Sequence, residues 1–184
     1  MDARSDPQLL DRLRDRRDRL ARAVGDPGSP AELSRLLGEL TNAYREDAQG
    51  RPIYDWTIVD RIFDTYLARD VKPYVEIGFM PEALSIKPQP YQHAWTPLAK
   101  YDEIYTGWAY PPKDYRKWGD LVHAWVAHCV ERYGRAEVEQ WYWQTWNEPN
   151  IGYWRGTPAE FRKLNDYAID AVRRASARRV TAVL

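Results

Sequence analysis

The sequence has little of what identifies several large classes of protein. Its 184 residues contain one cysteine, Cys129, so no intrachain disulfide is possible. Acidic and basic residues number 27 each, and the formal net charge of +0 gives no overall field that would attract nucleic acid or an anionic membrane. The charged N-terminus, Met1–Asp6, is not followed by the apolar core of a signal peptide, and no apolar run is long enough to cross a membrane. We therefore expect no nucleic-acid or membrane partner and a cytoplasmic location.

The short motifs that hold common cofactors are also missing. No Gly-x-Gly-x-x-Gly, Walker or Gly-x-Ser-x-Gly element occurs. His123 and His128 lie five residues apart on one expected helix, which is not the spacing of two metal ligands on one face. We expect no cofactor and no metal site.

What the sequence does have is tryptophan and tyrosine, at 9 and 13 residues against 3 phenylalanines. Their side chains combine a flat apolar face with a polar group. Sugar rings carry apolar C–H faces edged with hydroxyls, so this composition suits a carbohydrate cleft. It suits a core filled with large aromatic side chains equally well.

The order of secondary-structure signals predicts an α/β fold preceded by a helical segment. Residues 1–40 carry two helix signals, at 7–24 and from Ser29 to about Leu40. From Thr57 onward, helical and strand patterns alternate, as in a parallel sheet covered by helices. The expected helices start at Thr57, near Pro112 and at Thr157; the expected strands are Lys72–Gly78, Trp141–Trp146 and Val180–Leu184. A long loop over residues 80–111 is uncommon in a compact domain unless it is functional.

The most informative motif is Trp146-Asn147-Glu148-Pro149, directly after the second expected strand. A carboxylate there lies at the carboxyl edge of a parallel sheet, where α/β barrels build their active sites. Pro149 lacks an N–H and ends the strand. We expect Trp143 and Trp146 to form aromatic walls beside Glu148, which would act as a general acid, with Asn147 bonding a sugar hydroxyl. The alternative is an ordinary strand-ending turn with a surface glutamate, which the strand, the aromatic residues and the α/β alternation make less favoured.

Several other residues are candidates for contact with a substrate. Glu82 follows the first expected strand and could reach the cleft, and His93 lies in the long loop; both fit a peripheral or solvated position as well. Glu76, in the middle of a strand, could line a barrel interior, but a structural or peripheral position is the favoured interpretation. The loop aromatics could form a sugar platform or pack the loop onto the sheet, two interpretations of equal weight; they are Tyr91, Trp95, Tyr101, Tyr105, Trp108 and Tyr110.

The motif resembles the acid/base motif of the retaining (β/α)8-barrel glycosidases. Three further segments make the context similar to glycoside hydrolase family 39, the β-xylosidase and α-L-iduronidase family, over roughly residues 41–175. They are Lys72–Pro81, Pro111–Trp118 and Glu131–Gly134.

The resemblance implies a partial TIM barrel over residues 41–184, roughly strands three to five with their helices. It implies that Glu148 is the acid/base and Asn147 the contact to the sugar 2-hydroxyl. Their positions in the sequence, and not the resemblance, make Trp146, Glu82, His93 and Trp108 further substrate-binding candidates. The family nucleophile is a glutamate on the seventh strand, which these residues do not reach, so we expect little activity on a β-xyloside from the isolated chain. Two alternatives are a non-catalytic remnant that binds carbohydrate or a partner, and a half-barrel completed by another chain. An exposed sheet edge would favour self-association.

Overall fold

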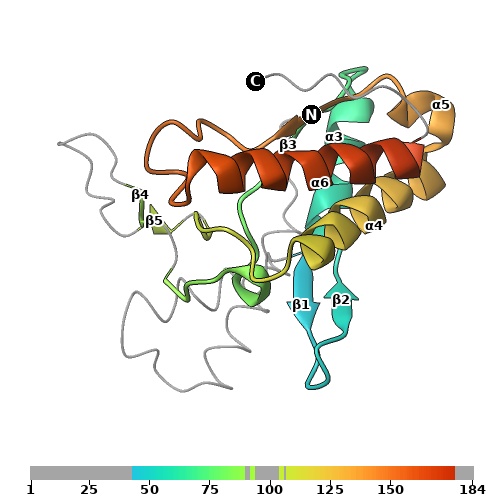
Figure 1. Cartoon of the computed structure of the whole chain (residues 1–184). Helices are drawn as coiled ribbons and strands as arrows, with labels where there is room; N and C mark the ends of the chain where they lie inside the picture. The colour runs from blue at the N-terminus through green and yellow to red at the C-terminus, as the bar shows by residue number, and fades with distance from the viewer. Residues whose placement is uncertain (1–42, 90–91, 94–103, 106, 177–184) are drawn as a thin grey trace. The chain divides into compact units, whose positions relative to one another are not determined.

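The computed structural model describes residues 43–89, 92–93, 104–105 and 107–176, all within a compact unit spanning Leu40–Leu184 (Figure 1). The helices expected at 7–24 and 29–40 and the strand expected at Val180–Leu184 lie outside these residues. Among the described helices, none combines the length and the apolar character needed to cross a membrane.

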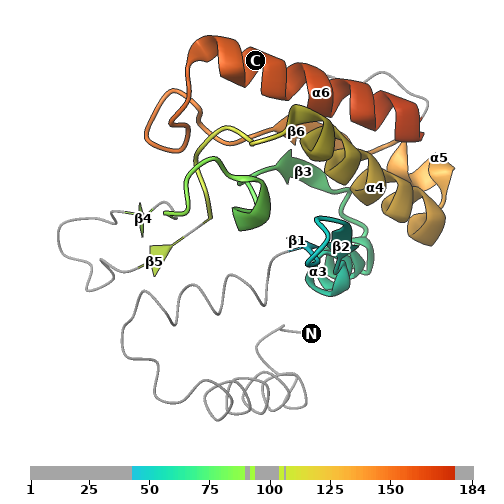
Figure 2. The same ribbon diagram turned by 60° about the horizontal axis from the view of Figure 1, so that its bottom comes forward.

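The centre of this unit is a parallel pair of strands, β3 (Tyr74–Ile77) and β6 (Tyr142–Thr145) (Figure 2). Their register places Val75 beside Trp143 and Ile77 beside Thr145. The parallel pairing confirms the prediction from the α/β alternation, although both strands are shorter than expected.

The two faces of this pair have different surroundings. Val75, Ile77 and Trp143 are buried on one face, whereas Tyr74 and Tyr142 on the other are exposed and stack with ring centroids 5.8 Å apart. Side chains alternate across a strand, so a strand with one covered face shows this period of two. Glu76 lies on the exposed face with the two tyrosines.

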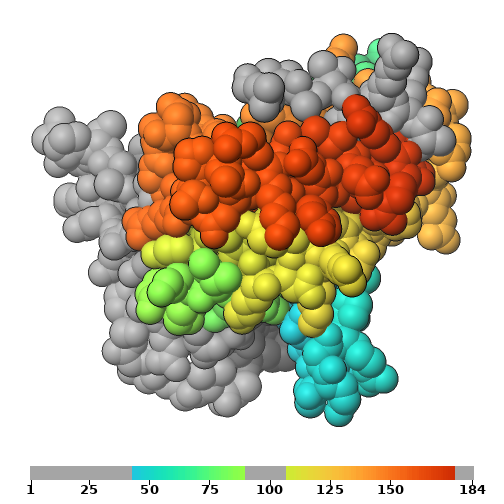
Figure 3. Space-filling model, in the orientation of Figure 1, coloured from blue at the N-terminus to red at the C-terminus, as the bar shows by residue number. Residues whose placement is uncertain are grey.

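The covered face packs against two long helices, α4 (Tyr115–Tyr133) and α6 (Pro158–Ser176), which lie side by side (Figure 3). The Trp118 indole N–H donates to the Leu164 carbonyl at 3.2 Å and joins the two helices inside the core. Cys129 is buried on the core side of α4. A four-residue helix, α5 (Arg135–Val138), follows α4 and was not predicted.

Side-chain caps explain where the two long helices begin. Asp114 accepts from the Arg116 and Lys117 backbone N–H groups at 2.7 and 3.4 Å, so α4 begins at Tyr115 and not near Pro112. Helix α6 begins after Thr157, as predicted, with a capping box. Thr157 N donates to a Glu160 carboxylate oxygen at 2.7 Å, and Glu160 N donates to the Thr157 hydroxyl at 3.2 Å. The Thr157 N–H lowers the pKa of Glu160.

Helix α3 (Thr57–Leu67) begins where the sequence predicted, and its Phe63 ring stacks on that of Trp125 in α4 with centroids 6.3 Å apart. Phe63 is buried with its ring 4.9 Å from that of Trp141. At the helix surface, Arg132 donates to Asp64 at 2.7 Å and lowers the pKa of that carboxyl.

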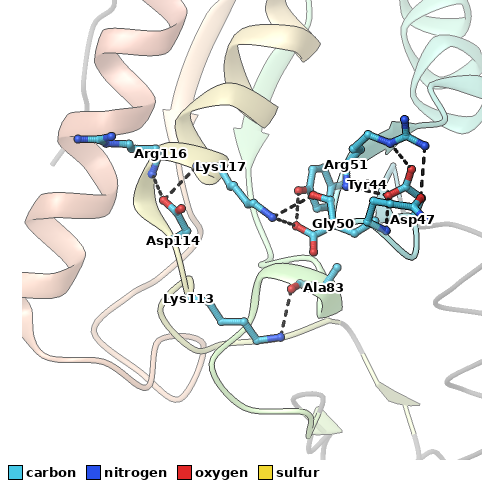
Figure 4. Close-up of polar contacts among 11 residues, drawn as sticks. Tyr44, Asp47, Gly50, Arg51, Ala83, Lys113, Asp114, Arg116 and Lys117 are labelled. Carbon is cyan, nitrogen blue, oxygen red and sulfur yellow. Dashed lines mark hydrogen bonds and ion pairs between the residues drawn. The ribbon is translucent and has the colours of Figure 1, made fainter.

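A hairpin of β1 (Tyr44–Glu46) and β2 (Pro52–Tyr54) was not predicted. Asp47 Oδ1 accepts from the N–H groups of Gln49 and Arg51, both at 2.9 Å, and Gly50 takes a φ of 73°. Lys117 fixes the hairpin to α4 by donating to Gly50 O at 3.1 Å and to the Glu46 carboxylate at 2.7 Å (Figure 4). The Asp-x-x-Gly turn was visible in the sequence, but three-residue strands are too short for a periodic signal.

The expected loop over residues 80–111 contains short ordered elements where it is described. A 3-10 turn, η2 (Glu82–Leu84), follows β3, and β4 (Gln92–His93) pairs antiparallel with β5 (Ile104–Tyr105). Backbone bridges also join Met80 to Trp108 and Ser85 to Pro112. These bridges hold both ends of the segment against the end of β3.

The fold class is therefore a partial α/β unit. Within the described residues each sheet has two strands and no barrel closes. The prediction of strands three to five, and that of self-association at a free sheet edge, are not tested by this arrangement and stay predictions.

The Trp118–Leu164 hydrogen bond leads to a stability prediction. We expect Trp118→Phe to lower the free energy of unfolding by about 0.5–1.5 kcal/mol more than Trp125→Phe, because it removes a buried hydrogen bond between the two helices. Trp125 is the matched control, since its indole N–H is buried without a hydrogen-bond partner among the described residues. Urea unfolding of both variants measures the difference, and equal losses would contradict the role given to this bond.

Cys129 leads to a prediction of chemical inertness. Burial, and to a smaller extent the nearby Asp60 carboxylate, raise the pKa of its thiol to about 12. The thiol therefore stays protonated at pH 8, and we expect its alkylation by iodoacetamide to be at least about 100-fold slower in the folded chain than in urea. Mass spectrometry over time measures both rates, and comparable rates would show that the thiol is exposed.

Candidate active site at the ends of β3 and β6

Because β3 and β6 are parallel, the carboxyl ends of both strands lie at the same edge of the sheet. The Trp146 N–H donates to the Ile77 carbonyl at 3.0 Å and forms the last bond between the two strands. Asn147 and Glu148 come directly after it. Their position is the one at which α/β barrels place catalytic groups.

The backbone makes a tight turn at the motif. Trp146 and Glu148 take φ angles of 67° and 42°, in the left-handed region that costs a residue with a side chain about 1–2 kcal/mol. The Ile151 N–H donates to the Glu148 carbonyl at 3.2 Å and closes the turn. Glu148 is exposed and Asn147 half-buried, so the carboxylate is accessible to a ligand.

Trp146 lies beneath this turn. Its side chain has no exposed surface, and its indole N–H donates to the Tyr153 carbonyl at 2.8 Å. The ring meets those of Phe79 and Trp154 edge to face, each at 5.3 Å between centroids. Trp146 was a candidate for contact with the substrate, but its ring has no exposed face to offer. It supports the turn from the core instead.

Trp143 does not form a wall beside Glu148, and that prediction was wrong. Its side chain is buried toward the helices, where its ring meets Trp125 edge to face at 5.9 Å. The reason is the strand period of two: Trp143 shares a face with Val75 of the neighbouring strand and turns toward the helix layer.

The remaining candidates lie on the segment after β3. Glu82 is half-buried at the start of η2, and His93 has its backbone in β4. Trp108 is buried and its indole N–H donates to the Pro88 carbonyl at 3.0 Å, which favours the packing interpretation over the sugar platform for this residue. Tyr91, Trp95 and Tyr101 lie outside the described residues.

Arg155 was not recognised from the sequence. Its backbone N–H donates to the Ala109 carbonyl at 2.7 Å, and its guanidinium donates to the Tyr110 hydroxyl at 3.2 Å. These bonds connect the loop after Glu148 to the segment that bridges back to β3. No local pattern marks Arg155, because its partners lie about 45 residues away in the sequence.

The described residues contain no group of three or more His, Cys, Asp or Glu side chains arranged to hold a metal ion. The chemistry available at this edge of the sheet is that of an exposed carboxylate beside an amide side chain.

Comparison with known proteins agrees with this geometry. The model of the family described as "Glycosyl hydrolases family 39" matches residues 28–180. A β-xylosidase of Geobacillus stearothermophilus is 39% identical over 146 residues, which is 75% of this chain and 26% of that protein. A β-xylosidase of Caldicellulosiruptor saccharolyticus is 34% identical over 141 residues, covering 76% and 26%.

A solved structure, that of a monomeric β-xylosidase from Caulobacter crescentus CB15, superposes with a TM-score of 0.61 at 32% identity, covering 74% of this chain and 25% of that one. The chain thus spans about a quarter of the length of the curated relatives it matches. The family model matches most of the sequence, and the parallel βα unit ends its strand in Trp-Asn-Glu-Pro. The chain therefore belongs to glycoside hydrolase family 39.

Proposed function

We propose that this chain supplies the acid/base carboxylate, Glu148, of a retaining glycosidase that acts on a β-xyloside. One observation carries the proposal: Glu148 is exposed at the carboxyl end of a parallel strand, on a turn anchored to the core by the side chain two residues earlier. The relatives that cover three quarters of the chain are named β-xylosidases, which supports the choice of substrate.

In the first step, Glu148 protonates the glycosidic oxygen as the bond to the anomeric carbon breaks. In the second step, the same carboxylate takes a proton from the water that attacks the glycosyl-enzyme. Asn147, half-buried beside Glu148, is the proposed partner of the sugar 2-hydroxyl, a hydrogen bond that strengthens in the transition state. Glu82 and His93 are proposed as outer contacts, on the segment that follows β3.

The nucleophile of this reaction is proposed to come from sequence outside these 184 residues. A retaining enzyme needs two carboxyl groups about 5–5.5 Å apart, and the family pattern places the second on a later barrel strand. In this assignment β3 and β6 are the third and fourth strands of a barrel. Residues 41–184 then contribute one part of the catalytic domain, and residues 1–40 precede it as a separate segment.

The proposal predicts that the isolated chain hydrolyses 4-nitrophenyl β-xyloside no faster than buffer does. The physical reason is that Glu148 alone can protonate a leaving group but cannot form the covalent intermediate. Release of nitrophenol measures the rate, with the Geobacillus stearothermophilus β-xylosidase as positive control.

Turnover that disappears in Glu148→Gln would contradict the placement of the nucleophile. A second carboxylate within these residues would then be acting, and Glu82 is the first to replace. Glu82→Gln and Glu76→Gln form a matched pair for this test. Loss of turnover in Glu82→Gln alone would identify Glu82, and loss in Glu76→Gln alone would identify the carboxylate on the exposed face of the sheet.

The acid/base role predicts a chemical rescue in a complete barrel. A chimera is made from the Geobacillus stearothermophilus enzyme by exchanging its matching segment for this chain. In it, Glu148→Ala should spare glycosylation by activated aryl xylosides and slow deglycosylation by about 10²–10⁴-fold. Azide attacks without base assistance, so adding it should restore turnover and give β-xylosyl azide, detected by NMR.

The unmutated chimera and Glu82→Ala are the controls, and neither should gain rate from azide. Loss of glycosylation itself in Glu148→Ala, with no azide product, would assign Glu148 a different role.

A further inference from the structure

We propose that Trp146 is a positioning residue for Glu148: its buried indole fixes the conformation of the turn that carries the carboxylate. The inference rests on the proposed acid/base function and adds a residue to it. Three features of the structure support it: the packing of the ring, the bond of its N–H, and the backbone conformation above it.

The ring is held by three separate parts of the fold. It meets Phe79 after β3 at 5.3 Å, Trp118 of α4 at 6.5 Å, and Trp154 before α6 at 5.3 Å, all between ring centroids. On the strand side it lies against Gly78, where an added Cβ would be 3.2 Å from the ring. The ring therefore cannot shift unless the sheet end or one of the helix connections shifts with it.

The indole N–H spans the turn. It donates at 2.8 Å to the carbonyl of Tyr153, seven residues ahead, so the side chain bridges both ends of the segment that contains Glu148. Inside this bridge, Ile151 N donates to Glu148 O at 3.2 Å, and at its far end Trp154 N donates to Ile151 O at 3.3 Å. Glu148 thus lies within two hydrogen-bonded closures, one made by the Ile151 N–H and one by the buried indole.

The backbone conformation shows what the bridge has to hold. Trp146 and Glu148 both lie in the left-handed region, which residues with a Cβ occupy only where surrounding contacts impose it. Neither is a glycine, so the conformation needs support from outside the turn. The indole bridge supplies that support, and it fixes the backbone from which the Glu148 carboxylate extends.

A general acid acts only within hydrogen-bond reach of the leaving oxygen, so a fixed backbone at Glu148 has a direct use in the reaction. A tryptophan that merely fills the core would stabilise the whole unit. A positioning tryptophan stabilises the Glu148 turn more than it stabilises the rest of the folded unit. This difference can be measured.

The test compares amide hydrogen exchange, residue by residue by NMR, in the chain itself and in Trp146→Phe. We expect exchange at the Ile151 and Trp154 N–H groups to become about tenfold to 100-fold faster relative to buried amides of α4, such as that of Val126. Trp154→Phe is the matched control: it shrinks a ring in the same cluster and loses a bond to Thr157 O, which lies outside the Glu148 turn. It should leave the exchange at Ile151 within about threefold.

Phenylalanine is smaller than tryptophan, so a second variant removes only the donor. Incorporating β-(3-benzothienyl)alanine at position 146 keeps the outline of the ring and replaces the N–H by sulfur. It should still accelerate exchange at Ile151. Unchanged exchange in this variant, or equal acceleration in Trp154→Phe, would overturn the proposal. Amide exchange is measured without substrate, so either of these outcomes would leave the acid/base assignment of Glu148 unaffected.

The catalytic consequence is read in the barrel chimera. For xylosides with poor leaving groups, Trp146→Phe should lower kcat by about tenfold or more and leave KM nearly unchanged. For activated xylosides, the rate constant of the glycosylation step should fall by less than about twofold. Equal losses for both classes of leaving group would show that Trp146 acts only on stability. A missing azide rescue in Glu148→Ala would instead remove the proposed function while leaving the exchange result intact.

Discussion

The hydrogen bonding of β3 to β6 is the constraint on which the rest of the described structure depends. Because the pairing is parallel, both strands end at one edge, and the last bond of the ladder runs from Trp146 N to Ile77 O. This bond brings the Trp146 ring over Gly78, where the missing side chain leaves room for it. The ring in turn supports the turn at Glu148. A short piece of sheet thus leads, through one tryptophan, to the backbone of the candidate acid/base.

The aromatic richness of the chain serves mainly the core in the part that the structure describes. Six tryptophans there are buried and lie between the sheet and the helices or beneath the strand ends: Trp108, Trp118, Trp141, Trp143, Trp146 and Trp154. Their indole N–H groups donate to carbonyl or carboxylate oxygens at Trp108, Trp118, Trp141, Trp146 and Trp154. Large indole rings fill the space between the elements, and each of these N–H groups has a hydrogen-bond acceptor although its ring is buried. Of the two interpretations of the composition, these residues favour core packing over a sugar cleft.

The open face of the sheet differs in chemistry from the covered one. Tyr74 and Tyr142 stack there, and the Tyr74 hydroxyl donates to the Gln144 side chain at 2.7 Å. In the proposed barrel assignment this face points inward, where branched aliphatic residues are usual. Tyrosines and a glutamine tolerate water better, since their polar ends remain hydrated while their rings cover each other.

The sequence by itself determined the elements whose signals are local. The helix start at Thr157, the apolar periodicity of the helices and the Asn147-Glu148-Pro149 motif at a strand end depend on residues within a few positions of one another. Only the tertiary structure decided which way Trp143 and Trp146 face, how the β1–β2 hairpin is anchored by Lys117, and that Arg155 joins two loops. In each of these cases the deciding partner lies across the fold: the helix layer, the glycine after the neighbouring strand, the β1–β2 turn, or a side chain about 45 residues away. Such contacts are selected by the packing of the whole unit, which a local pattern does not encode.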